Sequence, residues 1–168
     1  MRICTTDPTT AGWTKTALVC LAACITTGWS LPARADARAV VPENERRGLE
    51  HVLPGAPKET RGVRSVRLLG STDLEQDFPA MKGYVLRARE ITVAPGGQIG
   101  VHRHERRPGV AVMLEGEMTE RRAPAAQPKP LAPGEVAFEA AGVVHWWRNE
   151  TDAPAKAIVI DIVPKDLP

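Results

Sequence analysis

Short β-strand patterns separated by glycine and proline most constrain the fold of this chain. From residue 63 onward, segments of alternating polar and apolar residues recur roughly every ten residues, a spacing typical of all-β domains. No helix-sized segment lies between them, and parallel strands need such a crossover. The expected strands cover residues 63–69, 84–93, 101–104, 110–114 with 117–122, 136–138, 143–148 and 156–163. The sequence therefore predicts a sandwich or barrel.

Three features are expected to interrupt these strands. Residues 73–83 and the proline-rich segment 123–133 are predicted loops, and Pro-Gly-Gly at 95–97 predicts a turn. Within 84–93 the apolar positions change parity after residue 88, which indicates a bulge near residues 89–90 or the junction of two strands. The isoleucines at 158, 160 and 162 share one face of the last strand.

The first 35 residues have the organisation of a secretory signal peptide. Lys15 precedes the apolar run 17–25, Pro32 breaks the segment, and Ala-Arg-Ala at 33–35 is the small-x-small pattern of a cleavage site. The run is short for the roughly 20 residues of a membrane span. We expect cleavage before Asp36 and a periplasmic or secreted protein. The alternative is lipoprotein processing at Leu-Ala-Ala-Cys, which would leave a lipid on Cys24.

Removal of this leader changes what the composition implies. All three cysteines lie in it, so a chain that begins at residue 36 has neither disulfides nor a thiol nucleophile. Three of the 22 basic residues and one of the 20 acidic residues also lie there, which leaves the remainder without net charge. Nucleic-acid binding is therefore not expected.

The rest of the chain is expected to divide into two parts. Residues 36–62 are predicted to form an N-terminal arm with a short helical turn near 43–50, and residues 63–168 are predicted to form the barrel domain. The protein is expected to be a homodimer.

Histidines supply the candidate site. His102 and His104 are separated by one residue, and side chains at i and i+2 of a strand point to the same face. Both imidazoles can then serve one metal, whereas the alternative is an exposed loop whose polar residues face water. A third histidine, His145, lies in the segment 134–149. His51, in the arm, is expected to be a surface or packing residue.

These histidines and the glycines around them resemble the two motifs of the cupin superfamily. Gly96, His102, His104 and Gly116 fit the first motif, and Gly134, Gly142, His145 and Asn149 fit the second, with Ala140 at its proline position. The resemblance covers residues 84–163. It implies a double-stranded β-helix, the cupin jelly-roll barrel, with a metal or ligand pocket inside one end.

The chain departs from the family pattern at the glutamate of the first motif, where Gly109 stands. The resemblance then leaves His102, His104 and His145 as ligands of iron(II), zinc, copper or nickel, while Mn²⁺ and Mg²⁺, which prefer carboxylate oxygen, are less expected. Glu105 has the wrong parity to replace the glutamate. Glu117 or Glu120 can replace it only if the strand register turns that side chain inward.

Two further residues are candidates for ligand binding. Arg107 offers a guanidinium fork for a carboxylate, the alternative being an exposed turn arginine. Trp146 and Trp147 point to opposite faces, so one is expected inside the barrel, and Trp146 is the candidate ligand residue. The resemblance implies a barrel pocket that binds a divalent metal through the three histidines and a small ligand, in a reaction that the sequence does not specify; if the protein is an enzyme, the family's three-histidine oxygenases are the model. The alternative is a non-catalytic module that binds or senses a small molecule without metal. An empty barrel kept for assembly alone fits poorly with three retained histidines.

Overall fold

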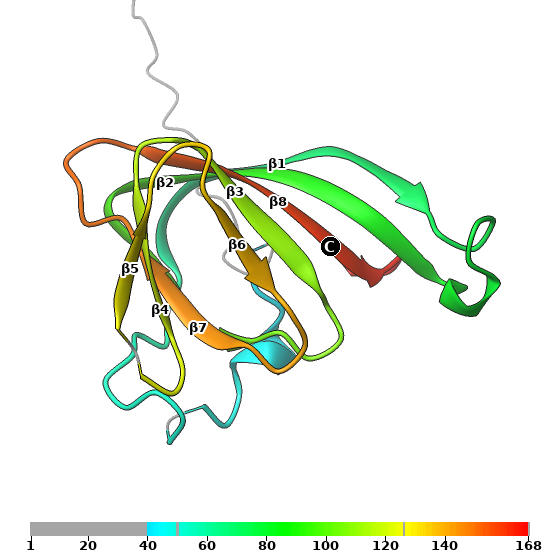
Figure 1. Ribbon diagram of the computed structural model, residues 1–168, viewed down its shortest axis with the longest axis horizontal. Helices are drawn as coiled ribbons and strands as arrows, with labels where there is room; N and C mark the ends of the chain where they lie inside the picture. The colour runs from blue at the N-terminus through cyan, green and yellow to red at the C-terminus, as the bar shows by residue number, and fades with distance from the viewer. Residues whose placement is uncertain (1–39, 50, 126, 168) are drawn as a thin grey trace, which may run out of the picture. The chain divides into compact units, whose positions relative to one another are not determined.

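The computed structural model describes residues 40–49, 51–125 and 127–167 of the 168-residue chain, and these form a nearly closed antiparallel β-barrel (Figure 1). The all-β prediction is confirmed. Within the described residues, two 3₁₀ turns, η2 (Glu43–Arg46) and η3 (Pro79–Met81), accompany the strands. The strands are β1 (Arg61–Asp73), β2 (Tyr84–Arg103), β3 (Gly109–Glu115), β4 (Met118–Arg122), β5 (Pro128–Leu131), β6 (Val136–Glu139), β7 (Val144–Arg148) and β8 (Ala155–Pro164).

One long strand, β2, organises the sheet. The strand order is β5-β4-β7-β2-β8-β3-β6, and β1 also pairs with β2. The first half of β2, Tyr84 to Val93, pairs with β8, whereas its second half, from Gln98 onward, pairs with β7. The sheet curls around this strand, with β4, β5 and β7 on one side and β3, β6 and β8 on the other (Figure 1).

The turn predicted at residues 95–97 is a bend inside β2. Gly96 takes a φ of +68°, a conformation that glycine adopts without the steric cost other residues meet. Backbone bonds from Gly96 N to Asn149 O and from Asn149 N to Gly97 O hold the bend against the end of β7. The strand therefore changes partner here without ending, and the prediction of two separate strands was wrong.

The predicted bulge in β2 is also corrected. Its register with β8 is regular from Tyr84 to Val93, and the irregularity near this point lies in β1, between Leu68 and Gly70. The inward positions of β2 are Arg87, Arg89, Ile91 and Val93, all buried and all of one parity. The apparent change of phase arose because two inward residues are arginines rather than apolar side chains.

Strand β5 lies in a segment predicted to be a loop. Pro128 and Pro130 belong to it, and it pairs only with β4, at one end of the strand order. Proline cannot donate a ladder hydrogen bond, but an edge strand leaves one side unpaired and tolerates it. The prolines therefore mark an edge strand rather than a loop.

The arm packs against its own barrel. The predicted helical turn is present as η2, and the valines before it, Val40 and Val41, are buried in the main core. Farther along, Leu49 and Leu53 pack with Val101 and Val144 on the outer side of β2 and β7. The segment predicted to be a signal peptide lies outside the described residues. Among the residues that are described, no helix is long and apolar enough to cross a membrane.

Candidate metal centre

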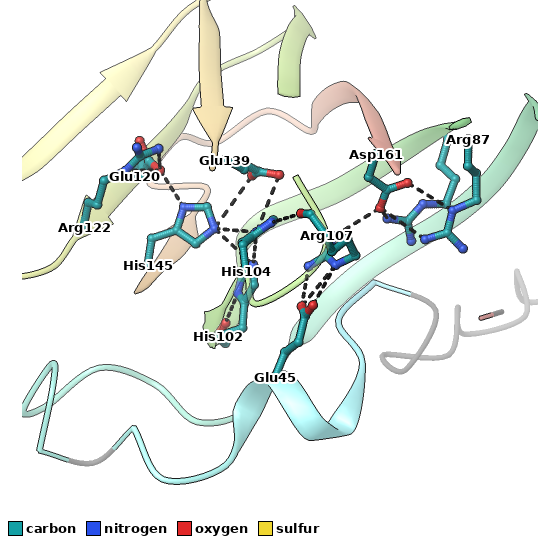
Figure 2. A network of polar contacts seen from close by, with 12 residues as sticks. Glu45, Arg87, His102, His104, Arg107, Glu120, Arg122, Glu139, His145 and Asp161 are labelled. Carbon is teal, nitrogen blue, oxygen red and sulfur yellow. Dashed lines mark hydrogen bonds and ion pairs between the residues drawn. The ribbon is translucent and has the colours of Figure 1, made fainter. Parts of the chain in front are cut away.

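The pairing of β2 with β7 brings the three histidines together. His102 lies opposite His145 in the ladder, and His104 follows directly after β2. Backbone bonds from His104 N to Val143 O and from Gly142 N to His104 O fix the end of β2 beside the loop before β7. All three side chains are fully or almost fully buried, and their Nε2 atoms converge (Figure 2).

The opposite nitrogen of each ring faces a hydrogen-bond acceptor. His102 Nδ1 lies 2.9 Å from Gly100 O, His104 Nδ1 lies 2.9 Å from Arg107 O, and His145 Nδ1 lies 2.5 Å from a carboxylate oxygen of Glu120. A carbonyl or carboxylate oxygen only accepts, so we assign the proton of each neutral ring to Nδ1. The three Nε2 lone pairs then point at one another.

This donor set fits a metal ion. The three Nε2 atoms lie 3.1, 3.1 and 3.2 Å apart. Nitrogen ligands about 2.1 Å from one cation stand ~3.0 Å apart at 90° and ~3.4 Å apart at the tetrahedral angle. Three convergent lone pairs at these distances repel one another unless a cation lies between them. The histidines therefore have the spacing and tautomer that a metal requires.

Electrostatics keep the rings neutral and able to bind a metal. Burial lowers the pKa of His102 and of His145 well below the usual value. Burial, together with the charge of Arg107, lowers the pKa of His104 to about 4. Deprotonated imidazole is the form that coordinates a metal, so no proton has to leave these rings at neutral pH.

Glu120 contacts the outer nitrogen of His145 instead of joining the Nε2 cluster. It is buried on β4, and Arg122 Nη2 donates to the same Oε1 at 2.6 Å. A carboxylate on the far nitrogen of a metal-binding histidine fixes the ring's orientation and raises its basicity. Glu120 therefore does reach inward, but it lies at the outer nitrogen of His145, in the position of a supporting residue rather than of a fourth ligand.

Glu139 is the carboxylate nearest the Nε2 atoms. Its Oε2 lies 3.6 Å from Nε2 of His104 and its Oε1 lies 3.7 Å from Nε2 of His145 (Figure 2). Both distances are too long for hydrogen bonds. Burial raises the pKa of Glu139 to about 7, although the charge of Arg107 acts in the opposite direction. This residue comes from β6 and was not among the sequence candidates.

Arg107 is buried in a charged cluster beside the histidines and is not an exposed turn arginine. Its guanidinium binds Glu45 of η2, with a closest distance of 2.6 Å, and Asp161 of β8 at 3.1 Å. Asp161 also accepts from Arg87 and Arg89. Burial raises the pKa of Asp161, but the hydrogen bond from Arg87 and the charges of the three arginines hold it below its usual value. The fork of Arg107 is thus occupied by carboxylates of the chain itself.

A pocket inside the barrel borders His102 of the histidine cluster. Its lining is mostly apolar, with His102, Glu139, Arg89 and Arg107 as the polar contributions. The tryptophan that faces this cavity is Trp147. Trp146 points to the other side of β7, where it packs on the outer apolar cluster under the guanidinium of Arg121. His51, the fourth histidine, is exposed and far from this arrangement in sequence.

Most residues of the site and its charged cluster that the sequence analysis missed are charged side chains at inward positions of strands; Glu45 of η2 is the exception. On β6, Ala137 and Glu139 are buried, whereas Phe138 is 73% exposed. On β8, Asp161 is buried while the neighbouring isoleucines, 160 and 162, are only partly covered. These residues could be identified by following the inward face from the three clustered histidines across the neighbouring strands. That step requires the strand register, which the sequence does not give.

Solved structures resemble this barrel. A predicted oxalate decarboxylase from Thermotoga maritima is 19% identical, with 68% of this chain and 95% of that chain covered and a TM-score of 0.46. A protein from Thermus thermophilus is 26% identical, with 69% and 93% covered and a TM-score of 0.47. The Cupin_2 domain of an XRE family transcriptional regulator from Enterobacter cloacae is 18% identical, with 62% and 100% covered and a TM-score of 0.47.

No curated protein matches the chain. Residues 89–161 match the family model described as Cupin domain. The matched segment runs from the inward-facing half of β2 to Asp161 of β8 and includes all three histidines. This span, the nearly closed antiparallel barrel and the two histidine motifs agree with one another, and residues 89–161 are a cupin domain.

Proposed function

We propose that this protein binds a divalent transition metal through His102, His104 and His145, and a small, largely apolar molecule in the adjoining cavity. One observation carries the proposal: all three Nδ1 atoms face acceptors, so three Nε2 lone pairs converge within 3.2 Å. Iron(II), zinc, copper and nickel all accept imidazole nitrogen. Such an ion supplies Lewis acidity to a bound ligand.

The surroundings of the histidines support the ligand part of this proposal. The cavity has the mostly apolar lining and the few polar groups that are typical of a small-molecule pocket. His102 and Glu139 border it, so the metal-ligating face and the apolar surface meet. Trp147 offers a flat apolar surface to a ligand, and its ring lies 5.8 Å from that of His145. We infer that the ligand places one polar group toward the histidines and an apolar body among the core side chains.

Metal analysis of the protein, purified without a polyhistidine tag, tests the metal part. We expect about one equivalent of metal per chain after dialysis with Zn²⁺, and loss of that equivalent in His104→Ala, since two imidazoles hold a metal much less tightly. His51→Ala is the matched control because His51 is exposed and outside the cluster. A metal content that is substoichiometric and the same in all three proteins would contradict the proposal.

We also propose that the chain is exported, on the sequence organisation of residues 1–35. Mass spectrometry of the protein recovered from its native cell distinguishes the two processing routes. A mature chain that begins at Asp36 supports cleavage by signal peptidase, and a lipidated chain that begins at Cys24 supports the lipoprotein route. An unprocessed chain in the cytoplasm would contradict export.

A further inference from the structure

We propose that Glu139 is the fourth protein ligand of the metal centre, supplied by β6 in place of the carboxylate that Gly109 lacks. This inference rests on the proposed three-histidine site and assigns one further residue to it. Three separate observations support it: the ladder register, the packing around Gly109, and the distances from the Glu139 carboxylate to the histidines.

The register places position 109 and Glu139 on the same face. Gly109 of β3 lies directly opposite Glu139 of β6, and on its other side it lies opposite Asp161 of β8. Directly opposite residues of antiparallel strands project their side chains to the same side of the sheet, about 5 Å apart. A carboxylate on β6 can therefore fill the space that a carboxylate at position 109 would use.

The backbone leaves no space for a side chain at position 109. A Cβ atom built on Gly109 would lie 2.8 Å from Ile160 O and 3.2 Å from the Cβ of Asp161. The first distance is well inside van der Waals contact with a backbone atom, which cannot move without disturbing β8. The glycine thus permits the close approach of β3 to β8, and the inward carboxylate stands one strand away.

The carboxylate of Glu139 is aimed at the Nε2 atoms and lies at a suitable distance. Its oxygens are 3.6 Å from His104 Nε2 and 3.7 Å from His145 Nε2 (Figure 2). Two ligands about 2.1 to 2.2 Å from one cation stand ~3.0 Å apart at 90° and ~3.7 Å apart at 120°. Both measured distances fall within this range. They are too long for a direct hydrogen bond and leave room for an ion between the groups.

The buried position of this carboxylate is consistent with that role. Glu139 is only 5% exposed, and a carboxylate is rarely buried unless it is paired or binds a metal. The other buried carboxylates nearby already have cationic partners: Glu120 binds Arg122, and Glu45 and Asp161 bind Arg107. With Glu139 the site offers three nitrogens and one oxygen. A metal(II) centre then carries a formal charge of +1 instead of +2.

Zn²⁺ affinity, measured by competition with a chromophoric chelator, tests the assignment. We expect Glu139→Gln to weaken Zn²⁺ binding by at least ~10-fold while the stoichiometry stays the same, because the amide is a poorer ligand than the carboxylate. Glu115→Gln is the matched control. Glu115 lies on β3, the strand next to β6, and the substitution removes the same charge from an exposed ion pair with Lys156 of β8. Glutamine has nearly the same volume, so circular dichroism and the thermal midpoint should show a folded protein.

Co²⁺ substitution separates a direct ligand from a nearby charge. The visible d–d bands of bound Co²⁺ report the donor atoms and their geometry, so Glu139→Gln is expected to shift them and change their intensity. Glu139→Asp keeps the charge but withdraws the carboxylate by one methylene, and we expect it to alter the bands as well. A charge that acts only at a distance would leave the bands of both variants like those of the wild type.

The two levels of the proposal fail in different ways. If the wild-type protein binds Zn²⁺ stoichiometrically but Glu139→Gln keeps its affinity within about twofold and its Co²⁺ bands unchanged, the assignment of Glu139 is overturned and the three-histidine site stands. If the wild-type protein binds no metal, or if His104→Ala binds as much metal as the wild type, the three-histidine site is overturned. The assignment of Glu139 is then overturned as well.

Discussion

At the scale of single residues, Asp161 is the side chain on which most buried charge depends. Three arginines from two segments donate to its carboxylate: Arg87, Arg89 and Arg107. Its side chain is fully buried, so water cannot replace any of these bonds. A buried ion pair is weak evidence for net stability, but removal of one partner leaves the other charges uncompensated at a high cost.

We therefore expect Asp161→Asn to lower the free energy of unfolding by about 3–5 kcal/mol. Denaturation in urea, followed by tryptophan fluorescence, measures the change. Asp73→Asn is the control, since Asp73 pairs with Lys165 at the surface and its loss should have little measurable effect. Equal midpoints for the two variants would show that the arginines find other partners.

Gly109 illustrates how a residue-level inference from sequence changes once the structure is known. The motif comparison assigns the missing glutamate to this position, which leads to a site with three ligands. The same comparison predicts that Gly109→Glu would tighten metal binding by restoring the carboxylate. The contact that a Cβ would make with Ile160 O shows why Gly109→Glu is instead expected to destabilise the barrel.

At the scale of elements, the arm is tied to the barrel through one buried ion pair. Glu45 of η2 binds Arg107, and both side chains are 5% exposed. The valines that precede η2 line the cavity, and the leucines that follow it cover the outer side of β2 and β7. The homodimer stays a prediction. Within one chain, the arm already forms part of the cavity wall.

Glu45→Gln should loosen the arm without unfolding the barrel. A hydrogen bond between two charged groups contributes about 1.5–3 kcal/mol, so amide hydrogen exchange in residues 40–49 should accelerate by ~10- to 100-fold. Exchange in β2 and β8 should be little affected. The control is Glu43→Gln on the same turn, where the partner Arg47 is exposed. Faster exchange throughout the barrel would mean that the arm and barrel unfold together.

Strand patterns allowed most elements to be predicted, but not which face of each strand is inside. The isoleucines of β8 and the apolar residues 136 and 138 of β6 do share faces, as expected, yet those faces point outward. The inward positions hold Arg87, Arg89, Glu139 and Asp161. Apolar alternation assumes an apolar interior, and this barrel has a partly charged one.

The histidine cluster could be predicted because two of its members lie close together in the sequence and the motif comparison supplies the third. One residue separates His102 from His104, and the second motif has a fixed spacing to His145. The charged cluster could not, since its bonds join residues 62 and 74 positions apart: Arg107 with Glu45 and Arg87 with Asp161. No short pattern records such pairs, and only the ladder register brings them together.

At the scale of the whole molecule, buried titratable groups make stability depend on pH. The pKa values of the three site histidines are lowered in the folded protein, so below about pH 6.5 the unfolded chain binds more protons than the folded chain. The stability that these neutral histidines contribute is fully present above that pH. It is lost as the pH falls toward about 4, the pKa of His104 in the folded protein. Glu139, whose pKa is raised to about 7, has the opposite effect and offsets one histidine.

We expect the metal-free protein, kept in a chelator, to lose stability between pH 6.5 and 5 with a slope of up to about 2.7 kcal/mol per pH unit, the linkage value for two net protons. Urea midpoints at several pH values test this. The metal-loaded protein should resist acid better until protons displace the metal. A metal-free protein whose midpoint is constant across this interval would contradict the expectation.

The two ends of Arg107 serve different neighbours, and this has a thermodynamic consequence. Its carbonyl accepts from His104, while its guanidinium holds the arm through Glu45. Arm docking and metal binding thus share one residue, and any coupling between the two equilibria is reciprocal. If the docked arm raises the metal affinity by some factor, the bound metal raises the equilibrium constant for arm docking by the same factor.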